Sequence, residues 1–364
     1  MNFRERLNAV LHLQEPDMVP YAPYDNLVPR GEFERELSEH GMGVLHRLSG
    51  RIWSEMPHVE IETRTEGGMV RTIYHTPKGD VWTERRTHLG RVTGVTGIQT
   101  EGLIKEIDDI DAVIFMADDT EYHVDNSAFF SRDRELGAYG LVRDQGLHPP
   151  YDATRGYFGA YSGIPNWVYA QQDHPARFQA LMEAEERRQA RLFPLVAASP
   201  GDFFSFGSLD GHFGHRNWAR NVLPFYEEYV PKLHEAGKIL ALHAHASNNL
   251  AYADLLKATG VDCIEAFTPP PVGDLSIAEA RRRWGADMII WINFPETVFY
   301  YGHDETRRYT EELLRSDPPG NRLVLGFTEM GTYGITDADS ERLFKDGFRA
   351  INEAIESVGA LPLG

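Results

Sequence analysis

The stretch Leu240-Ala-Leu-His-Ala-His-Ala-Ser-Asn-Asn, residues 240–249, ends an apolar run with two histidines two positions apart. Residues i and i+2 of a strand point to the same face of a sheet. We therefore expect His243 and His245 to leave the end of a buried strand side by side. Two neighbouring imidazoles at a strand end are suited to hold a metal ion. The stretch predicts a strand with a candidate metal site at its carboxyl end.

The segments on both sides of this stretch alternate between helix and strand patterns. A helix pattern at 224–236 precedes the strand at 238–243, and another helix pattern follows at 252–259. Further strands are predicted at 203–207, 263–267, 288–293 and 323–327, and further helices at 175–198, 277–284, 305–314 and 341–355. Strands that alternate with helices of this length form parallel βα units. The predicted fold class is therefore α/β, a (β/α)8 TIM barrel.

The N-terminal part of the chain departs from this rhythm. A first strand is predicted at 18–24, and residues 56–100 alternate in polarity, with turns at Gly67-Gly68 and at 77–79. This pattern predicts an antiparallel β-hairpin insertion in the barrel. Short strands are also predicted at 107–115 and 138–142. We expect one barrel domain over residues 1–364, because α/β barrels often run to this length as single domains.

Composition limits the partners. The net charge is −19, from 36 basic and 55 acidic residues, which argues against nucleic acids and anionic membranes. Cys263 is the single cysteine, so no disulfide framework is possible and a reducing, cytoplasmic location is expected. The N-terminus lacks the apolar core of a signal peptide, and no apolar run is long enough to cross a membrane.

The predicted strand ends carry polar side chains, and polar side chains at the ends of apolar strands cost desolvation free energy unless they bind something. They are Asp210, His212, His243, His245, Glu265, Thr328 and Glu329. Catalytic zinc commonly takes three protein ligands, and His243, His245 and Glu329 form one suitable set. Glu265 or Cys263 is the alternative third ligand.

Each of these residues also has a plain structural interpretation. The two histidines are then hydrogen-bonded rim residues without a metal, Asp210 caps a turn, and Glu265 is salt-bridged. Cys263 is interpreted first as a small core residue. Three polar residues also have candidate functional roles. Asp210 and Glu265 are candidates to orient the ligand histidines, and His212 is a candidate acid or base.

Several motifs resemble the uroporphyrinogen decarboxylase superfamily. They lie at residues 4–11, 15–20, 233–238, 260–265, 269–274 and 283–287, in the order and spacing of that superfamily. The resemblance covers nearly the whole chain and implies a (β/α)8 barrel. The decarboxylase itself carries an Arg-Gln-Ala-Gly-Arg element after its first strand, whereas residues 23–30 here hold only Arg30 as a basic residue. Porphyrinogen decarboxylation is therefore not expected.

The chain is more similar to the methyltransferase branch, whose members work with methylated corrinoids. The resemblance places His243 on the zinc-binding histidine of that branch, His245 on its first cysteine and Glu329 near its later cysteine. An imidazole and a carboxylate in place of two thiolates make the zinc a harder, stronger Lewis acid. This departure favours an oxygen ligand, as in the O-demethylases of the superfamily, over a thiol.

The resemblance thus implies a zinc-dependent O-demethylase that moves a methyl group from a small methoxylated (aromatic) compound to cob(I)alamin. Tyr21, Tyr24, Tyr161 and Trp167 are candidates to line the substrate pocket. The chain shows no cobalamin-binding module, so a separate corrinoid protein or free cofactor is implied, and the family suggests a homodimer. Two alternatives stay open: a zinc-dependent lyase or hydrolase without corrinoid, and a non-catalytic tetrapyrrole-binding barrel.

Overall fold

The computed structural model describes residues 1–87, 97–159, 163–209, 211–245, 249–317, 320–328 and 335–362, with His212 described by its backbone alone. These residues form two compact units. Unit 1 comprises Met1–Ser49, Asn126–Gly146 and Ser199–Gly364, and unit 2 comprises Gly50–Asp125 and Leu147–Ala198.

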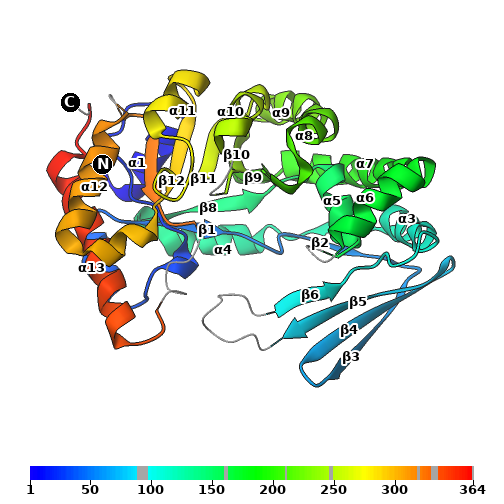
Figure 1. Cartoon of the computed structure of the whole chain (residues 1–364). Helices are drawn as coiled ribbons and strands as arrows, with labels where there is room; N and C mark the ends of the chain where they lie inside the picture. The colour runs from blue at the N-terminus through cyan, green and yellow to red at the C-terminus, as the bar shows by residue number, and fades with distance from the viewer. Residues whose placement is uncertain are drawn as a thin grey trace. The chain divides into compact units, whose positions relative to one another are not determined.

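A parallel sheet forms the centre of unit 1 (Figure 1). Its seven strands follow the order β1-β8-β9-β10-β11-β12-β13, and every neighbouring pair is parallel. The strands are β1 (Val44–Arg47), β8 (Gly140–Gln145), β9 (Phe203–Ser208), β10 (Ile239–His243), β11 (Cys263–Phe267), β12 (Ile289–Asn293) and β13 (Leu323–Gly326). All residues of β11 and β12 are buried, as expected for strands of a parallel sheet that is covered on both faces.

The helices of unit 1 lie before, between and after these strands in the chain. They are α1 (Phe3–Leu11), α2 (Glu32–Glu39), α4 (Ser127–Leu136), α8 (His215–Asn221), α9 (Leu223–Glu235), α10 (Asn249–Ala258), α11 (Ile277–Trp284), α12 (His303–Arg315) and α13 (Ala338–Val358). Short 3-10 helices lie at Asp25–Leu27, Gly137–Tyr139, Gly211–Phe213 and Glu296–Tyr301. Asp337 begins α13 with a capping box to Ser340, which satisfies backbone N–H groups that the first turn leaves unpaired.

Aromatic side chains fill the core of unit 1. The rings of Phe203 and Trp291, from β9 and β12, stack with centroids 5.8 Å apart and an interplanar angle of 5°. Phe327 and Phe348 bring the end of β13 against α13, with centroids 4.5 Å apart. Burial of such large rings contributes to the hydrophobic stabilisation of this core.

The segment 20–24 links the two edge strands of this sheet. On one side, the N–H of Ala22 donates to the Leu325 carbonyl at 2.7 Å. On the other side, the N–H of Gly43 donates to the Tyr21 carbonyl at 3.0 Å, and that of Leu45 donates to the Pro23 carbonyl at 2.9 Å. Tyr21 forms parallel bridges to both Met42 and Leu325. The sheet is therefore curled, so that β13 and β1 flank one common segment.

Unit 2 contains two antiparallel sheets. One pairs β2 (Ile52–Glu55) with β7 (Glu121–Val124), and the other has the order β3-β4-β5-β6. The latter strands are β3 (Glu60–Glu66), β4 (Met69–Thr76), β5 (Gly79–Thr87) and β6 (Gly97–Glu101) (Figure 1). The helices of unit 2 are α3 (Asp109–Asp119), α5 (Pro150–Tyr157), α6 (Ile164–Asp173) and α7 (Pro175–Ala197).

The α/β class, the parallel βα rhythm after residue 200 and the antiparallel excursion in residues 56–100 are confirmed. The strand predicted at 107–115 is wrong, because α3 covers Asp109–Asp119. Buried Ile110, Val113 and Ala117 recur at helical spacing there, and the short apolar run concealed this period. In the part of the chain that the structure describes, no helix combines the length and apolar character that a membrane crossing requires.

Candidate functional site at the strand ends

The predicted histidine pair lies at the carboxyl end of β10. His243 is the last residue of the strand, and its ring centroid lies 4.4 Å from that of His245, with the ring planes at 80°. The His243 side chain is 19% exposed, and His245 is exposed. The two imidazoles are thus adjacent and reachable from solvent, as a metal site with an open position requires.

Irregular backbone shapes this end of the sheet. His245 has φ 58° and Ala266, which follows Glu265, has φ 56°. Residues other than glycine rarely occupy this left-handed region, because it costs about 1 kcal/mol or more. The pairing register also shifts between Ala241 and His243 and between Ile264 and Phe267. Such bulges redirect side chains and are common beside active sites, so the histidines and Glu265 occupy specifically shaped positions.

A buried ion pair lies next to the histidines. Arg143 of β8 ion-pairs with Oε2 of Glu265 of β11, and both side chains are almost completely buried. The same carboxylate oxygen lies 3.5 Å from Nδ1 of His243. Burial opposes ionisation of Glu265, but the Arg143 charge and the His243 contact outweigh it, so the pKa of this carboxyl lies below its usual value. Glu265 is therefore a charged group placed to hold the orientation of the His243 ring.

Tyr24 packs against the same arginine. Its hydroxyl accepts a hydrogen bond of 3.1 Å from Nη1 of Arg143. The guanidinium carbons of Arg47 and Arg143 lie 4.2 Å and 5.2 Å from the ring centroid. Burial raises the pKa of Tyr24 far above its usual value, so the phenol stays neutral. Tyr24, a predicted substrate residue, thus lies beside Glu265 and two cations.

Two polar side chains and one backbone N–H connect the ends of β11, β12 and β13. Nδ2 of Asn293 donates to Oγ1 of Thr268 at 3.1 Å, and the N–H of Thr328 donates to Oδ1 of Asn293 at 2.9 Å. All three residues are buried. The hydroxyl of Thr328 has no hydrogen-bond partner among the described residues. This network fixes the backbone immediately before Glu329, the predicted third metal ligand.

Cys263 lies two residues before Glu265 on β11 and is fully buried. Burial, together with the Glu265 charge, raises the pKa of its thiol well above the usual value. Because metals bind the thiolate, this environment favours the interpretation of Cys263 as a core residue over its alternative role as a ligand.

Other predicted residues are not described at this site. Asp210, Tyr161 and Glu329 lie outside the described residues, as does the His212 side chain. Trp167 lies in unit 2, where its Nε1 donates to Oγ1 of Thr154 at 3.1 Å and its ring packs on Tyr151. Its substrate role, like those of the undescribed residues, stays a prediction. Tyr21 is buried in unit 1.

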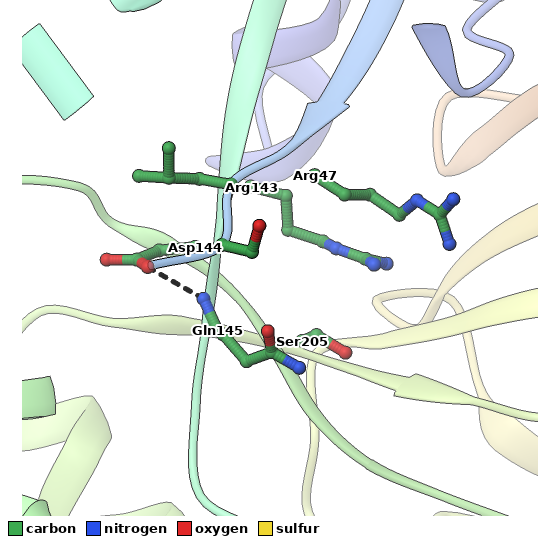
Figure 2. Close-up of a pocket in the computed structure, with 7 residues that line it drawn as sticks. Arg47, Arg143, Asp144, Gln145 and Ser205 are labelled. Carbon is green, nitrogen blue, oxygen red and sulfur yellow. Dashed lines mark hydrogen bonds between the residues drawn. The ribbon is translucent and has the colours of Figure 1, made fainter. Parts of the chain in front are cut away.

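A cavity of about 300 Å³ opens beside the ion pair at the ends of β1, β8 and β9. Its lining residues are Arg47, Leu48, Ser49, Arg143, Asp144, Gln145 and Ser205. Figure 2 shows the side chains of Arg47 and Arg143 extending in the same direction. Of these, Arg143 had a detectable sequence signal, a charge directly after the apolar run Leu141-Val142. The strand predicted at 138–142 stopped one residue before it.

A second group with metal-ligand chemistry lies in unit 2. Ligand atoms of Glu55, Glu121 and His123 lie within 4.8 Å of one another on β2 and β7. Nε2 of His123 is 3.0 Å from Oε1 of Glu55, and the His123 ring stacks on Trp53. The two glutamates are exposed, and exposed ion pairs of this kind are common without a metal. The sequence prediction did not include this group.

Comparison with known proteins adds a likeness of fold. No family model and no curated protein matches this sequence. Among solved structures, a methyltransferase from Methanosarcina mazei is similar over 98% of this chain and 99% of its own, with a TM-score of 0.55 and 11% identity. A B12-independent methionine synthase from Shewanella sp. W3-18-1 covers 93% of this chain and 98% of its own, with a TM-score of 0.37 and 10% identity. The first likeness confirms the predicted resemblance at the level of fold.

Proposed function

We propose that this protein is a zinc-dependent, corrinoid-linked methyltransferase that removes the methyl group of a small methoxylated compound. The observation that carries the proposal is the His243–His245 pair beside the buried Arg143–Glu265 ion pair, at the strand ends of a sheet. Carboxyl ends of parallel strands are where α/β barrels hold their active sites. The likeness to a methyltransferase over almost the full chain supports the reaction class.

The donor set fits a catalytic zinc ion. His243, His245 and Glu329 are the proposed ligands, a His2Glu set that leaves one coordination position open. Glu265 lies 3.5 Å from Nδ1 of His243, which leaves Nε2 as the nitrogen directed to the metal. When bound, zinc would act as a Lewis acid on the ether oxygen and stabilise the alkoxide or phenoxide that leaves. The chain's own part is to hold the histidine tautomer, orient the substrate and exclude water.

The corrinoid would supply the nucleophile that accepts the methyl group. We propose that it comes from a separate corrinoid protein or as free cob(I)alamin. We also propose that the segment 20–24 closes the sheet into an eight-stranded barrel, since it bonds to both β13 and β1. A single barrel domain, a homodimer and a cytoplasmic location stay predictions.

The lyase or hydrolase alternative needs a general base at the metal. Glu265 is poorly suited to that role, because its carboxylate is held by Arg143 in a buried ion pair. Its placement beside the His243 ring favours an orienting role, which demethylation requires as much as hydrolysis does. This geometry therefore favours methyl transfer over the lyase or hydrolase alternative.

The proposal is tested by incubating the zinc-loaded protein with cob(I)alamin and a panel of methyl ethers. We expect the absorption spectrum of cob(I)alamin to change to that of methylcobalamin with at least one ether, and the demethylated product to appear in equal amount. The His243→Ala variant is expected to lose this activity. An intact metal site without demethylation of any ether would contradict the proposal and favour the lyase or hydrolase. Tetrapyrrole binding by a metal-free protein, unchanged in His243→Ala, would favour the non-catalytic alternative.

A further inference from the structure

Four polar side chains converge on the cavity beside the ion pair, and the strand register explains why. Arg47 of β1 pairs with Arg143 of β8, and Gln145 of β8 pairs with Ser205 of β9. Paired residues of parallel strands, and residues two apart on one strand, point to the same face. Arg47, Arg143, Gln145 and Ser205 therefore share one face of the sheet at the strand ends, the face on which Arg143 reaches Glu265.

The positive charge of Arg143 is matched by a carboxylate, but that of Arg47 is not. Arg143 ion-pairs with Glu265, whereas Arg47 donates to the neutral amide oxygen of Asn26 at 3.0 Å. Among the described residues, no carboxylate forms an ion pair with Arg47. Two guanidinium groups on paired residues repel each other unless a further anion joins them.

One buried donor beside this cavity lacks a hydrogen-bond partner. Arg143 is 6% exposed, and its Nε has no hydrogen-bond partner among the described residues. A buried donor without a partner is costly, and an acceptor in the adjacent cavity would relieve that cost. The one acidic lining residue, Asp144, is occupied elsewhere. Its Oδ2 accepts from the Ser199 hydroxyl at 2.7 Å. Its Oδ1 accepts from the Gln145 N–H at 2.8 Å (Figure 2).

We infer that the cavity lined by Arg47, Arg143, Gln145 and Ser205 binds the carboxylate group of a small molecule. This inference rests on the proposed function, in which the carboxylate belongs to the methyl-donor substrate. Guanidinium groups recognise planar carboxylates with two parallel hydrogen bonds, and the amide of Gln145 and hydroxyl of Ser205 add neutral donors. A volume of about 300 Å³ suits a small ligand. The Arg143–Glu265–His243 contacts then link the anchored end of the substrate to the proposed metal site.

The test compares two ligands that differ only in the carboxylate. Binding of 4-methoxybenzoate and of methoxybenzene to the full zinc-loaded protein is measured by calorimetry, without corrinoid. We expect 4-methoxybenzoate to bind at least about tenfold more tightly than methoxybenzene. The Arg47→Gln variant should lose that advantage, and Arg47→Lys should regain part of it because the charge returns without the planar fork.

The matched control is Arg308→Gln, which removes one positive charge from an exposed arginine on α12. It should leave the binding of 4-methoxybenzoate unchanged. Arg47 is exposed, so its variants are expected to fold, and their melting temperatures verify this. Equal affinities of wild type and Arg47→Gln for 4-methoxybenzoate would overturn the inference. Tighter binding of inorganic phosphate than of 4-methoxybenzoate, lost in Arg47→Gln, would also overturn it and assign the cavity to a phosphate group.

The same ligands separate this inference from the proposed function. Carboxylate binding that depends on Arg47, without demethylation of any ether, would refute the proposed function and retain the carboxylate site. Demethylation of methoxybenzene and 4-methoxybenzoate with equal kcat/KM would retain the proposed function and refute the carboxylate site.

Discussion

Two arginine–carboxylate pairs described in unit 1, each with a buried carboxylate, lie at opposite ends of the sheet and differ in how completely the arginine is bonded. Arg281 lies on α11, near the amino ends of β12 and β13, and pairs with Asp317 through two hydrogen bonds of 2.8 Å. Its remaining nitrogen donates to the carbonyls of Gly285, Ala286 and Met288. Every side-chain nitrogen of Arg281 is thus bonded.

Arg143, at the carboxyl ends, pairs with Glu265 and Tyr24 but leaves Nε without a partner among the described residues. Both arginines line cavities of similar size, about 260 Å³ for Arg281 and about 300 Å³ for Arg143. Cavity size therefore does not distinguish the two ends of the sheet. An arginine Nε left unbonded in the described part of the chain does not distinguish them either, because Arg322 beside Arg281 has one as well. The difference is that, within the described ranges, the Arg281 pair bonds only Asp317 and backbone carbonyls, whereas the Arg143 pair contacts His243 through Glu265. This contrast matches the division of α/β barrels into a stability face and an active face.

The largest expected effect tests the feature that the two pairs share, a buried carboxylate whose charge is balanced by an arginine. Arg143→Met and Arg281→Met should each lower the free energy of unfolding by about 3–5 kcal/mol, because each leaves a buried carboxylate without its cation. Chemical denaturation of both variants measures this. The double variants Arg143→Met/Glu265→Gln and Arg281→Met/Asp317→Asn should recover much of the loss. A loss below about 1 kcal/mol in Arg143→Met would show that its pair is not the buried contact described.

The next prediction tests the difference between the pairs, which is that only the Glu265 carboxylate contacts a proposed metal ligand. Glu265→Gln should weaken zinc binding about 10–100-fold, because the orienting carboxylate of His243 is replaced by a neutral amide. Asp317→Asn is the matched control and should leave zinc affinity unchanged while it lowers stability. Competition with a zinc chelator measures both affinities. Equal zinc affinities in the two variants would remove the functional distinction between the two ends of the sheet.

A smaller effect is expected from the hydroxyl of Tyr24. Tyr24→Phe removes the acceptor for Nη1 of Arg143 and should cost about 1 kcal/mol of stability, the net value of one hydrogen bond. The guanidinium would then be held less firmly, so the affinity for 4-methoxybenzoate should fall as well. Tyr309→Phe, which removes a hydroxyl bonded to the Pro270 carbonyl, is the control for stability alone. An unchanged ligand affinity in Tyr24→Phe would show that the hydroxyl does not position Arg143.

The smallest effect concerns the half-exposed pair between Arg6 and Asp17. The hydrogen bond from Arg6 lowers the pKa of Asp17 to about 2. A carboxyl with a lowered pKa stabilises the fold above its unfolded pKa of about 4, and that contribution disappears as the pH falls toward 2. Asp17 is 45% exposed, so solvent screening limits the contribution to less than about 1 kcal/mol. Denaturation of Asp17→Asn should show a shallower loss of stability between pH 4 and pH 2 than wild type, and identical profiles would contradict this.

The sequence predicted the repeating elements well and the site only in part. Apolar strands such as β11 and β12 carry strong local signals, so their positions and parallel order followed from the pattern. His243, His245 and Glu265 were found because polar residues at the end of an apolar run stand out. Arg47 and Gln145 gave no such signal. Their role depends on the register between β1, β8 and β9, which brings together residues about 60 to 100 positions apart.

The helix α3 shows the limit for short apolar runs. Over so short a window, the apolar pattern of residues 107–115 is compatible with a helix or with a strand. The packing of Ile110 and Val113 on one helical face determines that a helix forms. The irregular backbone at His245 and Ala266 was likewise beyond sequence patterns, because residues other than glycine rarely adopt positive φ and no turn signal marks these two positions. Both features are set by tertiary contacts, and the second lies where function is proposed.

The most direct test of the account is the metal content of the purified protein after zinc is supplied. We predict about one zinc per chain in the wild type, lost in His243→Ala and in Glu329→Ala and kept in His123→Ala, which alters the exposed group of unit 2. Retention in the first two variants with loss in His123→Ala would place the metal in unit 2. That result, or a wild type that binds no zinc, would contradict the claim that the strand ends of unit 1 form a metal-dependent active site.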